Sequence, residues 1–195
     1  LFDTGPGPDV LVHNAEHLGI DLASTDAVVL SHGHYDHTGG LMEVLKRAGK
    51  IPLFLHPGAL IPRYSRKKDG TVREIGAPSP VEEGTLRERV SALNWTAEPS
   101  AVTGEVRVTG HVPRRTNYED TGGDFYLDEA CSHPDPIEDD QSIFFDTSEG
   151  TVVLLGCCHA GIVNTLHYVQ AITGGRPIHA VLGGTHLIAA SKGRM

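Results

Sequence analysis

The chain has 195 residues, of which 39% are hydrophobic and 21% are charged, a composition typical of one soluble α/β domain. Its 16 lysines and arginines against 25 aspartates and glutamates give a formal charge of −9, which disfavours binding to nucleic acid. No apolar run approaches the roughly 18 residues that cross a bilayer, and no signal peptide opens the chain. We therefore expect a cytoplasmic protein without a nucleic-acid or membrane partner.

The first part of the chain alternates helical and strand patterns. Apolar residues at near-helical spacing predict a short surface helix over 10–18. The aliphatic run 26–30 predicts a strand buried on both faces, and 51–55 predicts the next strand. Between them, 39–48 predicts a helix, because its apolar residues share one face, basic residues fill its last turn and Gly49 follows as a C-cap.

The rest of the chain contains two segments without a clear pattern. Residues 61–98 are polar and irregular, which indicates an insertion with short strands or a mobile lid. Residues from about 109 to 140 are rich in Pro, Gly and Asp and predict a long loop. The remaining predicted elements are strands at 102–108, 142–145, 151–155 and 178–182, and a helix at 162–172.

The main functional signal is the segment Ser31-His32-Gly33-His34-Tyr35-Asp36-His37. It follows a buried strand and precedes a helix, a position where open α/β sheets bind ligands. In an extended loop His32 and His34 project to the same side and can bind one metal ion, while Asp36 and His37 can turn toward a second. The segment therefore predicts a metal site with four ligands.

Two further histidines follow predicted strands. His159 comes shortly after strand 151–155, and His186 comes shortly after strand 178–182. If these strands run parallel to 26–30, their carboxyl ends meet at one edge of the structure. The two histidines would then complete the shells of two metal ions.

The H-x-H-x-D-H pattern resembles the signature of the metallo-β-lactamase superfamily, whose members bind two metals, usually zinc and in some branches iron or manganese. More narrowly, the sequence resembles the dihydropterin synthase-like branch, and this resemblance rests on residues 1–5, 31–41, 139–142, 156–161 and 183–187. It implies an α/β fold, the αββα sandwich, over a single domain 1–195. Superfamily members usually have further strands before residue 3 and further elements after the last histidine, so we expect a fragment that is incomplete at both ends.

The resemblance also implies a division of the ligands. One metal would be held by His32, His34 and His159, and the other by Asp36, His37 and His186. Asp36 would also be catalytic by orienting the nucleophile, and Asp3 would hydrogen-bond a ligand histidine or a loop amide. The residue that bridges the two ions stays open among four candidates, which are Asp139, Asp140, Cys157 and Cys158.

Three classes of function fit these residues. A hydrolase would use two divalent ions, with zinc favoured over iron or manganese, to activate water without a nucleophilic serine. A transferase would join a dihydropterin diphosphate to a ribofuranosyl-aminobenzene phosphate with release of diphosphate, as in the enzyme that names the branch. A metal-binding or di-iron redox protein is the third class, and a secreted antibiotic-hydrolysing lactamase is disfavoured by the absence of an export signal.

The substrate is expected to be a small molecule. Two groups of basic residues are either solvated charges or ligands for substrate phosphates, and the sequence leaves the oligomeric state open. The basic residues are Arg63, Arg66, Lys67, Lys68, Arg114 and Arg115.

Overall fold

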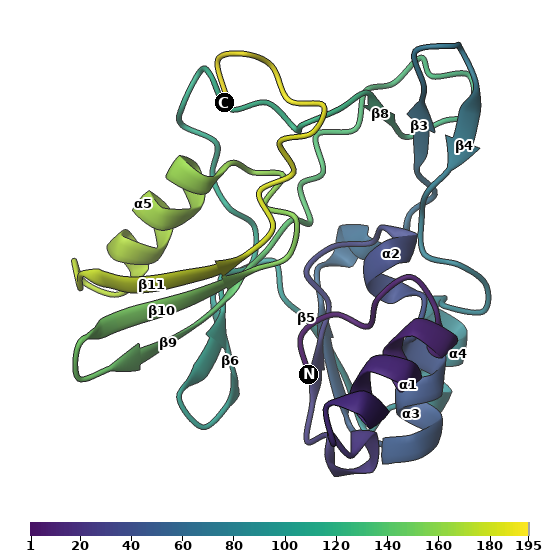
Figure 1. The fold of residues 1–195 in the computed structure, drawn as a ribbon, viewed down its shortest axis with the longest axis vertical. Coiled ribbons are helices and arrows are strands. Elements are labelled where there is room, and N and C mark those ends of the chain that lie inside the picture. The colour runs from purple at the N-terminus through teal and green to yellow at the C-terminus, as the bar shows by residue number, and fades with distance from the viewer. Residues whose placement is uncertain (195) are drawn as a thin grey trace.

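The chain folds into layers in the order helix, sheet, sheet, helices (Figure 1). The structure is a computed structural model that describes residues 1–194. The first sheet contains three parallel strands, which are β1 (Val28–Val29), β2 (Pro52–Leu55) and β5 (Ala92–Trp95). The second sheet has the order β11-β10-β9-β7-β6, with β11 (Ile178–Gly183), β10 (Gly150–Leu155), β9 (Ile143–Thr147), β7 (Val106–Val108) and β6 (Ser100–Thr103). The predicted α/β sandwich is confirmed.

Helices on the outer face of the first sheet close one hydrophobic core. They are α1 (Pro8–His17), α3 (Leu41–Ala48) and α4 (Glu83–Arg89). Helix α3 forms because Leu41, Val44 and Leu45 share one face that is buried in this core. Gly49, at φ 78°, ends the helix. Short 3₁₀ turns, η1 (Leu22–Ser24) and η2 (Pro57–Leu60), follow α1 and β2.

The outer face of the second sheet is covered by α5 (Ile162–Ile172), and the predicted helix over 162–172 is confirmed. Phe144, Val153, Leu155 and Val169 form the core between this helix and the sheet. Strand β10 pairs with β11 in parallel and with β9 in antiparallel orientation. The carboxyl ends of β10 and β11 therefore lie side by side.

A third, smaller sheet stands beside the two-sheet body (Figure 1). Its strands are β3 (Tyr64–Arg66), β4 (Val72–Glu74) and β8 (Phe125–Tyr126) in the order β4-β3-β8. Strands β3 and β4 form a hairpin, which we call the basic hairpin, residues 64–74. Strand β8 lies within the long segment 109–140, which is otherwise irregular.

The structure differs from the sequence-based expectation at two places. The segment 61–98 is an insertion only in its first part, because α4 and β5 return to the first sheet and Leu86 is fully buried in its core. The predicted strand 102–108 is wrong as a single strand. It is the hairpin β6–β7, whose turn contains Gly104 at φ 52°. Within residues 1–194, no helix combines the length and the apolar character that a membrane crossing requires.

Candidate metal centre

The loop after β1 carries the H-x-H-x-D-H pattern at the carboxyl end of that strand. The pattern ends in α2 (Tyr35–Thr38), a single helical turn. Gly33 is needed for close packing, because a Cβ at this position would lie 2.0 Å from the carbonyl oxygen of Ala59 in η2. The side chains of His32 and His34, on either side of Gly33, are buried.

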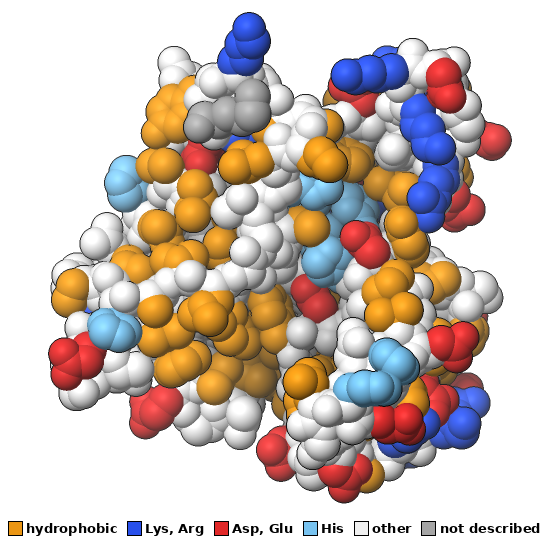
Figure 2. Space-filling model, viewed as in Figure 1, with side chains coloured by type: hydrophobic (Ala, Val, Ile, Leu, Met, Phe, Trp, Pro, Cys, Tyr) orange, Lys and Arg blue, Asp and Glu red, His pale blue; other side chains and the backbone are white. Residues whose placement is uncertain are grey.

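Five imidazole rings meet where the strand ends of both sheets come together. They belong to His32, His34, His37, His159 and His186. The ring centroids of His32 and His159, which come from different sheets, are 4.9 Å apart, and those of His159 and His186 are 4.4 Å apart. Figure 2 shows histidine side chains in the hollow between the two halves of the molecule. The structure therefore brings together all five histidines that the sequence singled out.

The donor atoms of this cluster form three overlapping groups. The groups are His32, His34 and His159; His32, His37 and Cys157; and Cys157, His159 and His186. Within each group the ligand atoms lie within 4.8 Å of one another. Imidazole nitrogens and a thiolate are the ligands that zinc prefers in proteins. The chemistry and spacing of these donors fit a metal centre.

Two nitrogen atoms in the cluster are free to bind a metal. Nε2 of His34 and Nε2 of His159 are buried and have no hydrogen-bond partner among the described residues. Nδ1 of His159 donates to the carbonyl oxygen of Thr121 at 2.7 Å, which leaves the lone pair of that ring on Nε2. A buried polar atom without a partner is costly, so a bound cation would offset this cost.

Burial sets the charge of most of these rings. It lowers the pKa of His32, His34 and His159 well below the usual value, and the neighbouring rings lower it further. Burial also lowers the pKa of His186. Neutral imidazoles result, which is the protonation state that binds metal ions.

His37 differs from the other four histidines. Its Nδ1 donates to Oδ2 of Asp3 at 2.7 Å, and its Nε2 lies 3.1 Å from Sγ of Cys157. Burial alone would lower the pKa of His37, but the hydrogen bonds with Asp3 and Cys157 outweigh it and raise this pKa to about 10. Asp3 also accepts hydrogen bonds from the backbone N of Ser31 at 2.6 Å and from its Oγ at 2.8 Å. A metal ion on Nε2 of His37 would take the place of the proton there.

The four candidates for a bridging ligand are no longer equivalent. Cys157 faces the cluster, whereas Sγ of Cys158 lies 3.4 Å from Thr165 and burial raises the pKa of that thiol to about 12. Asp139 accepts from the backbone N of Gly33 and pairs with a buried arginine. Asp140 accepts from the backbone N of Ala160 at 2.9 Å, and burial raises its pKa to about 6.

Asp36 lies at the edge of the cluster. Its Oδ2 is 3.7 Å from Nε2 of His37, and its side chain is 46% exposed. It belongs to none of the three donor groups described above. Asp36 instead lines a pocket beside the histidines, where its carboxylate can meet a substrate or a water molecule.

This pocket has a volume of about 310 Å³ and lies between α2, the basic hairpin and the segment that carries β8. Phe125 forms part of its wall and contacts the rings of His34 and His186, with centroids 5.3 and 5.8 Å away. Arg73 lies with its guanidinium carbon 4.4 Å from the ring centre of Tyr35. The sequence did not single out Phe125 or Arg73, because neither lies in a recognisable pattern.

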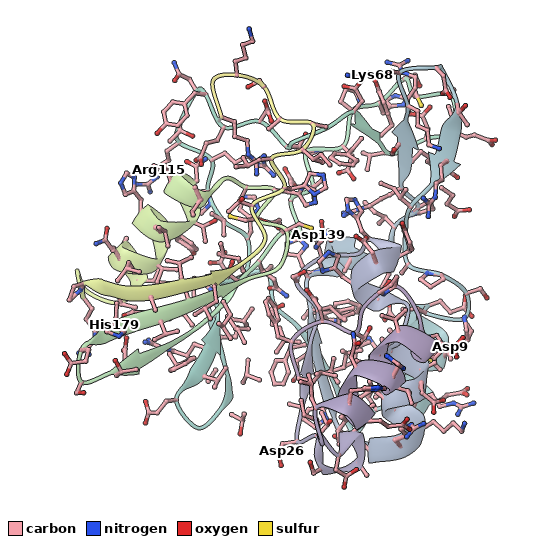
Figure 3. All side chains as sticks on the ribbon, in the orientation of Figure 1. Asp9, Asp26, Lys68, Arg115, Asp139 and His179 are labelled. Carbon is pink, nitrogen blue, oxygen red and sulfur yellow. The ribbon has the colours of Figure 1, made fainter. Side chains whose placement is uncertain are left out.

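The predicted phosphate ligands have separate locations. Arg66 and Lys67 line the pocket, and Figure 2 shows basic side chains along the hairpin. Arg63 is 1% exposed and pairs with buried carboxylates, so it does not reach the pocket. Arg114 donates to the carbonyl oxygen of His159 at 2.8 Å. Arg115 lies beside α5 and Lys68 lies in the hairpin without lining the pocket (Figure 3).

Comparison with known proteins identifies the family. A family model described as a beta-lactamase superfamily domain matches residues 1–121. The chain is 30% identical to 7,8-dihydropterin-6-methyl-4-(beta-D-ribofuranosyl)-aminobenzene-5'-phosphate synthase of Methanocaldococcus jannaschii, over all of this chain and 67% of that protein. It is 31% identical to an uncharacterized protein of the same organism, over 98% of this chain and 69% of that one. The chain belongs to the metallo-β-lactamase superfamily, and its predicted resemblance to the dihydropterin synthase-like branch is confirmed.

Solved structures agree with this assignment. A metal-dependent hydrolase of the beta-lactamase superfamily superposes with a TM-score of 0.78 at 31% identity, over 99% of this chain and 68% of that chain. The Rm3 metallo-beta-lactamase has a TM-score of 0.50 at 15% identity, over 94% of this chain and 66% of that chain, and shares the fold alone. The predicted metallo-β-lactamase fold is confirmed.

Proposed function

We propose that this protein is a metal-dependent hydrolase that uses two divalent metal ions to activate water. The observation that carries the proposal is a pair of buried Nε2 atoms, on His34 and His159, that have no hydrogen-bond partner among residues 1–194. The two histidines follow strands of different sheets. When held by these residues, two ions would supply an activated water and would offset negative charge on a substrate oxygen. His32, His34 and His159 would hold one ion, and His37, His186 and Asp36 the other. Cys157, which stands in two of the three donor groups, would be a further ligand.

Zinc is the metal that we propose for both positions. Cys157 stands in two of the three donor groups, and a thiolate favours zinc over manganese or magnesium. Asp36 would accept a hydrogen bond from the attacking water and orient it toward the substrate, which is why its partial exposure to the pocket matters. Nδ1 of His37 is fixed by Asp3, so the orientation of this ring is set before any ion binds.

The substrate that we propose is a small anionic molecule, in the simplest case a phosphorylated one. Arg66, Lys67 and Arg73 all line the pocket beside the cluster, in a chain whose formal charge is −9. The ring of Tyr35 supports Arg73 from one side, which reduces the freedom that this guanidinium would lose on binding an anion.

A transferase is the second candidate, and one observation favours it. The relative of known activity is a synthase whose name includes a phosphate, and the chain is 30% identical to it. In that case the basic hairpin would hold the diphosphate of one substrate, and an aromatic substrate rather than water would attack. Diphosphate release measured with and without an acceptor distinguishes the two, since a hydrolase needs water alone.

Metal content tests the proposal before any substrate is known. Elemental mass spectrometry of the purified protein is expected to find close to two zinc ions per chain, and the variants His34→Ala, Cys157→Ala and His159→Ala are expected to lose at least one. His179→Ala, an exposed histidine on β11, is the matched control and should keep both. A folded protein without metal after incubation with zinc would overturn the proposal, and iron in place of zinc would favour redox chemistry.

Anion binding is tested separately with inorganic diphosphate as the probe. Arg66→Ala and Arg73→Ala are each expected to weaken its binding about 10-fold or more, because charge-assisted hydrogen bonds contribute roughly 1.5–3 kcal/mol. Lys68→Ala in the same hairpin does not line the pocket and serves as the control. Equal effects of all three variants would argue for a diffuse charge effect and against a built subsite.

A further inference from the structure

Arg63 is a fully buried cation in an acidic protein. Its side chain is 1% exposed, just before β3, where the chain enters the basic hairpin. Nε lies 3.2 Å from Oδ2 of Asp135, and Nη2 lies 2.6 Å from Oδ1 of Asp139. Nη2 also donates to the carbonyl oxygen of Gly58 at 3.0 Å. Burial of a charge is costly unless partners of this kind are present, so Arg63 depends on these three contacts to remain buried.

Asp139, one of the partners of Arg63, also contacts the histidine loop. Asp139 uses its second oxygen, Oδ2, to accept a hydrogen bond from the backbone N of Gly33 at 2.7 Å. Gly33 is the residue between His32 and His34, and Asp139 itself is completely buried. Figure 3 shows Asp139 in the middle of the molecule, between the two sheets.

Arg63 also fixes the surface on which Gly33 packs. Gly58, which accepts from Arg63, belongs to η2 together with Ala59. The Cα of Gly33 lies so close to the carbonyl of Ala59 that no Cβ could fit between them. One guanidinium therefore contacts both supports of the loop, the carboxylate that binds the amide of Gly33 and the turn beneath it.

We propose that Arg63 is a positioning residue for the metal centre. It acts through Asp139 and η2 to hold Gly33, and thereby sets the directions of His32 and His34 before an ion binds. This role replaces the contact with substrate phosphate that the sequence suggested for Arg63. The planar guanidinium is required because it reaches Asp135, Asp139 and Gly58 from one group, whereas a lysine would supply the charge from a single point.

The proposal rests on the metal site of the proposed function, so its test has a readout that needs no metal. In metal-free protein, Arg63→Lys and Asp139→Asn are each expected to increase the rate of hydrogen exchange at the amide of Gly33. In zinc-binding assays against a chromophoric chelator, each is expected to weaken binding about 10- to 100-fold, the effect typical of residues that orient metal ligands. The double variant should be no weaker than the poorer single variant, because both residues act through one chain of contacts.

Arg107→Lys is the matched control. It alters a partly exposed pair with Asp146 between β7 and β9 and should change neither readout. A merely structural Arg63 would give Arg63→Lys a lower melting temperature with unchanged Gly33 exchange and unchanged zinc affinity in the folded protein, and that result would overturn the inference. If Arg63→Lys does not fold, Asp135→Asn decides by the same two readouts, because Asp135 pairs with Arg63 whereas the amide of Gly33 donates to Asp139. If the wild-type protein binds no zinc, the proposed function fails, while the exchange of Gly33 still decides on Arg63.

Discussion

Nδ1 of His37 donates to Oδ2 of Asp3 at 2.7 Å, across 34 positions of the chain. The same carboxylate holds the backbone N and the hydroxyl of Ser31, so it joins both ends of the histidine loop. The orientation of His37 thus depends on a residue that belongs to none of the three donor groups described above.

Asp3→Asn is expected to weaken zinc binding about 10- to 100-fold, because a neutral amide polarises and orients the imidazole less than a carboxylate does. Competition with a chromophoric chelator measures this change. Asp9→Asn, an exposed position in the first turn of α1, should leave the affinity as it is. Wild-type affinity in Asp3→Asn would mean that the hydrogen bond with Ser31, and not that with His37, is the relevant role of Asp3.

The three cysteines are expected to differ in alkylation by iodoacetamide. Cys131 and Cys157 are partly exposed, whereas Cys158 is 1% exposed and burial raises its pKa to about 12. Since only the thiolate reacts, Cys158 should stay unmodified below about pH 10. Zinc should protect Cys157 and leave Cys131 reactive, as peptide mass spectrometry would show. Modification of Cys157 at the same rate with and without zinc would remove it from the ligand set.

Gly33→Ala is expected to abolish zinc binding and to destabilise the fold. The added Cβ would lie 2.0 Å from the carbonyl oxygen of Ala59, so the loop must move away from η2. Gly84→Ala is the control, because a Cβ in that turn of α4 meets no atom within 4 Å and alanine should stabilise the helix by about 0.5–1 kcal/mol. Denaturant unfolding and zinc titration of both variants check this pair of opposite effects.

Glu119 caps α5 from a distant part of the chain. Its two carboxylate oxygens accept from the backbone N of Val163 and of Asn164, both at 2.9 Å, and the helix has no cap from Gly161 at its own N-terminus. Glu119→Ala is expected to lower the free energy of unfolding by about 1–2 kcal/mol, the cost of losing an N-cap. Glu88→Ala, exposed on α4, should change it by less than about 0.5 kcal/mol. Similar midpoints in urea for the two variants would refute the capping role.

Asp128 gives a pH-dependent prediction. Hydrogen bonds from the backbone N of Ser132 and of His133 lower its pKa from 3.8 to about 2. Because the folded-state pKa is below the unfolded value, the contribution of Asp128 to stability is present above about pH 3.8 and is lost as the pH falls through about 2. A carboxyl ¹³C titration should give this low midpoint, and Asp128→Asn should remove this part of the acid dependence. A midpoint near 3.8 would contradict it.

The candidate ligands that the sequence indicated are those whose positions follow from local spacing or from strand ends. His32, His34 and His37 lie in one short segment after a buried strand, and His159 and His186 follow two strands that proved to be parallel neighbours. The choice between Cys157 and Cys158 could not be made in this way. Adjacent side chains point in different directions, and only Cys157 of the two faces the histidines. The backbone of Cys158 has φ 55°, a conformation that no sequence pattern here predicts.

The parts that the sequence did not predict depend on contacts between distant residues or on a single turn residue. Arg63 and Arg66 are close in sequence, yet Arg63 is buried because it pairs with Asp135 and Asp139. Both carboxylates lie more than 70 positions further along the chain, so no local pattern indicates the pairing. The hairpin β6–β7 was read as one strand because a single Gly104 interrupts an otherwise alternating pattern. For Arg63 the deciding information is tertiary packing, which overrides local preference, and for β6–β7 it is the turn at one glycine.

In the cluster, His32, His34 and His37 follow a strand of the first sheet. Cys157, His159 and His186 follow strands of the second sheet. Metal ions held between them would act as a cross-link that exists only when both sheets are folded and docked. Above the dissociation constant, each tenfold rise in free zinc would then add about 1.4 kcal/mol per site to the free energy of unfolding. The concentration of free zinc would therefore set the fraction of folded, docked protein, and a chelator would lower that fraction as a denaturant does.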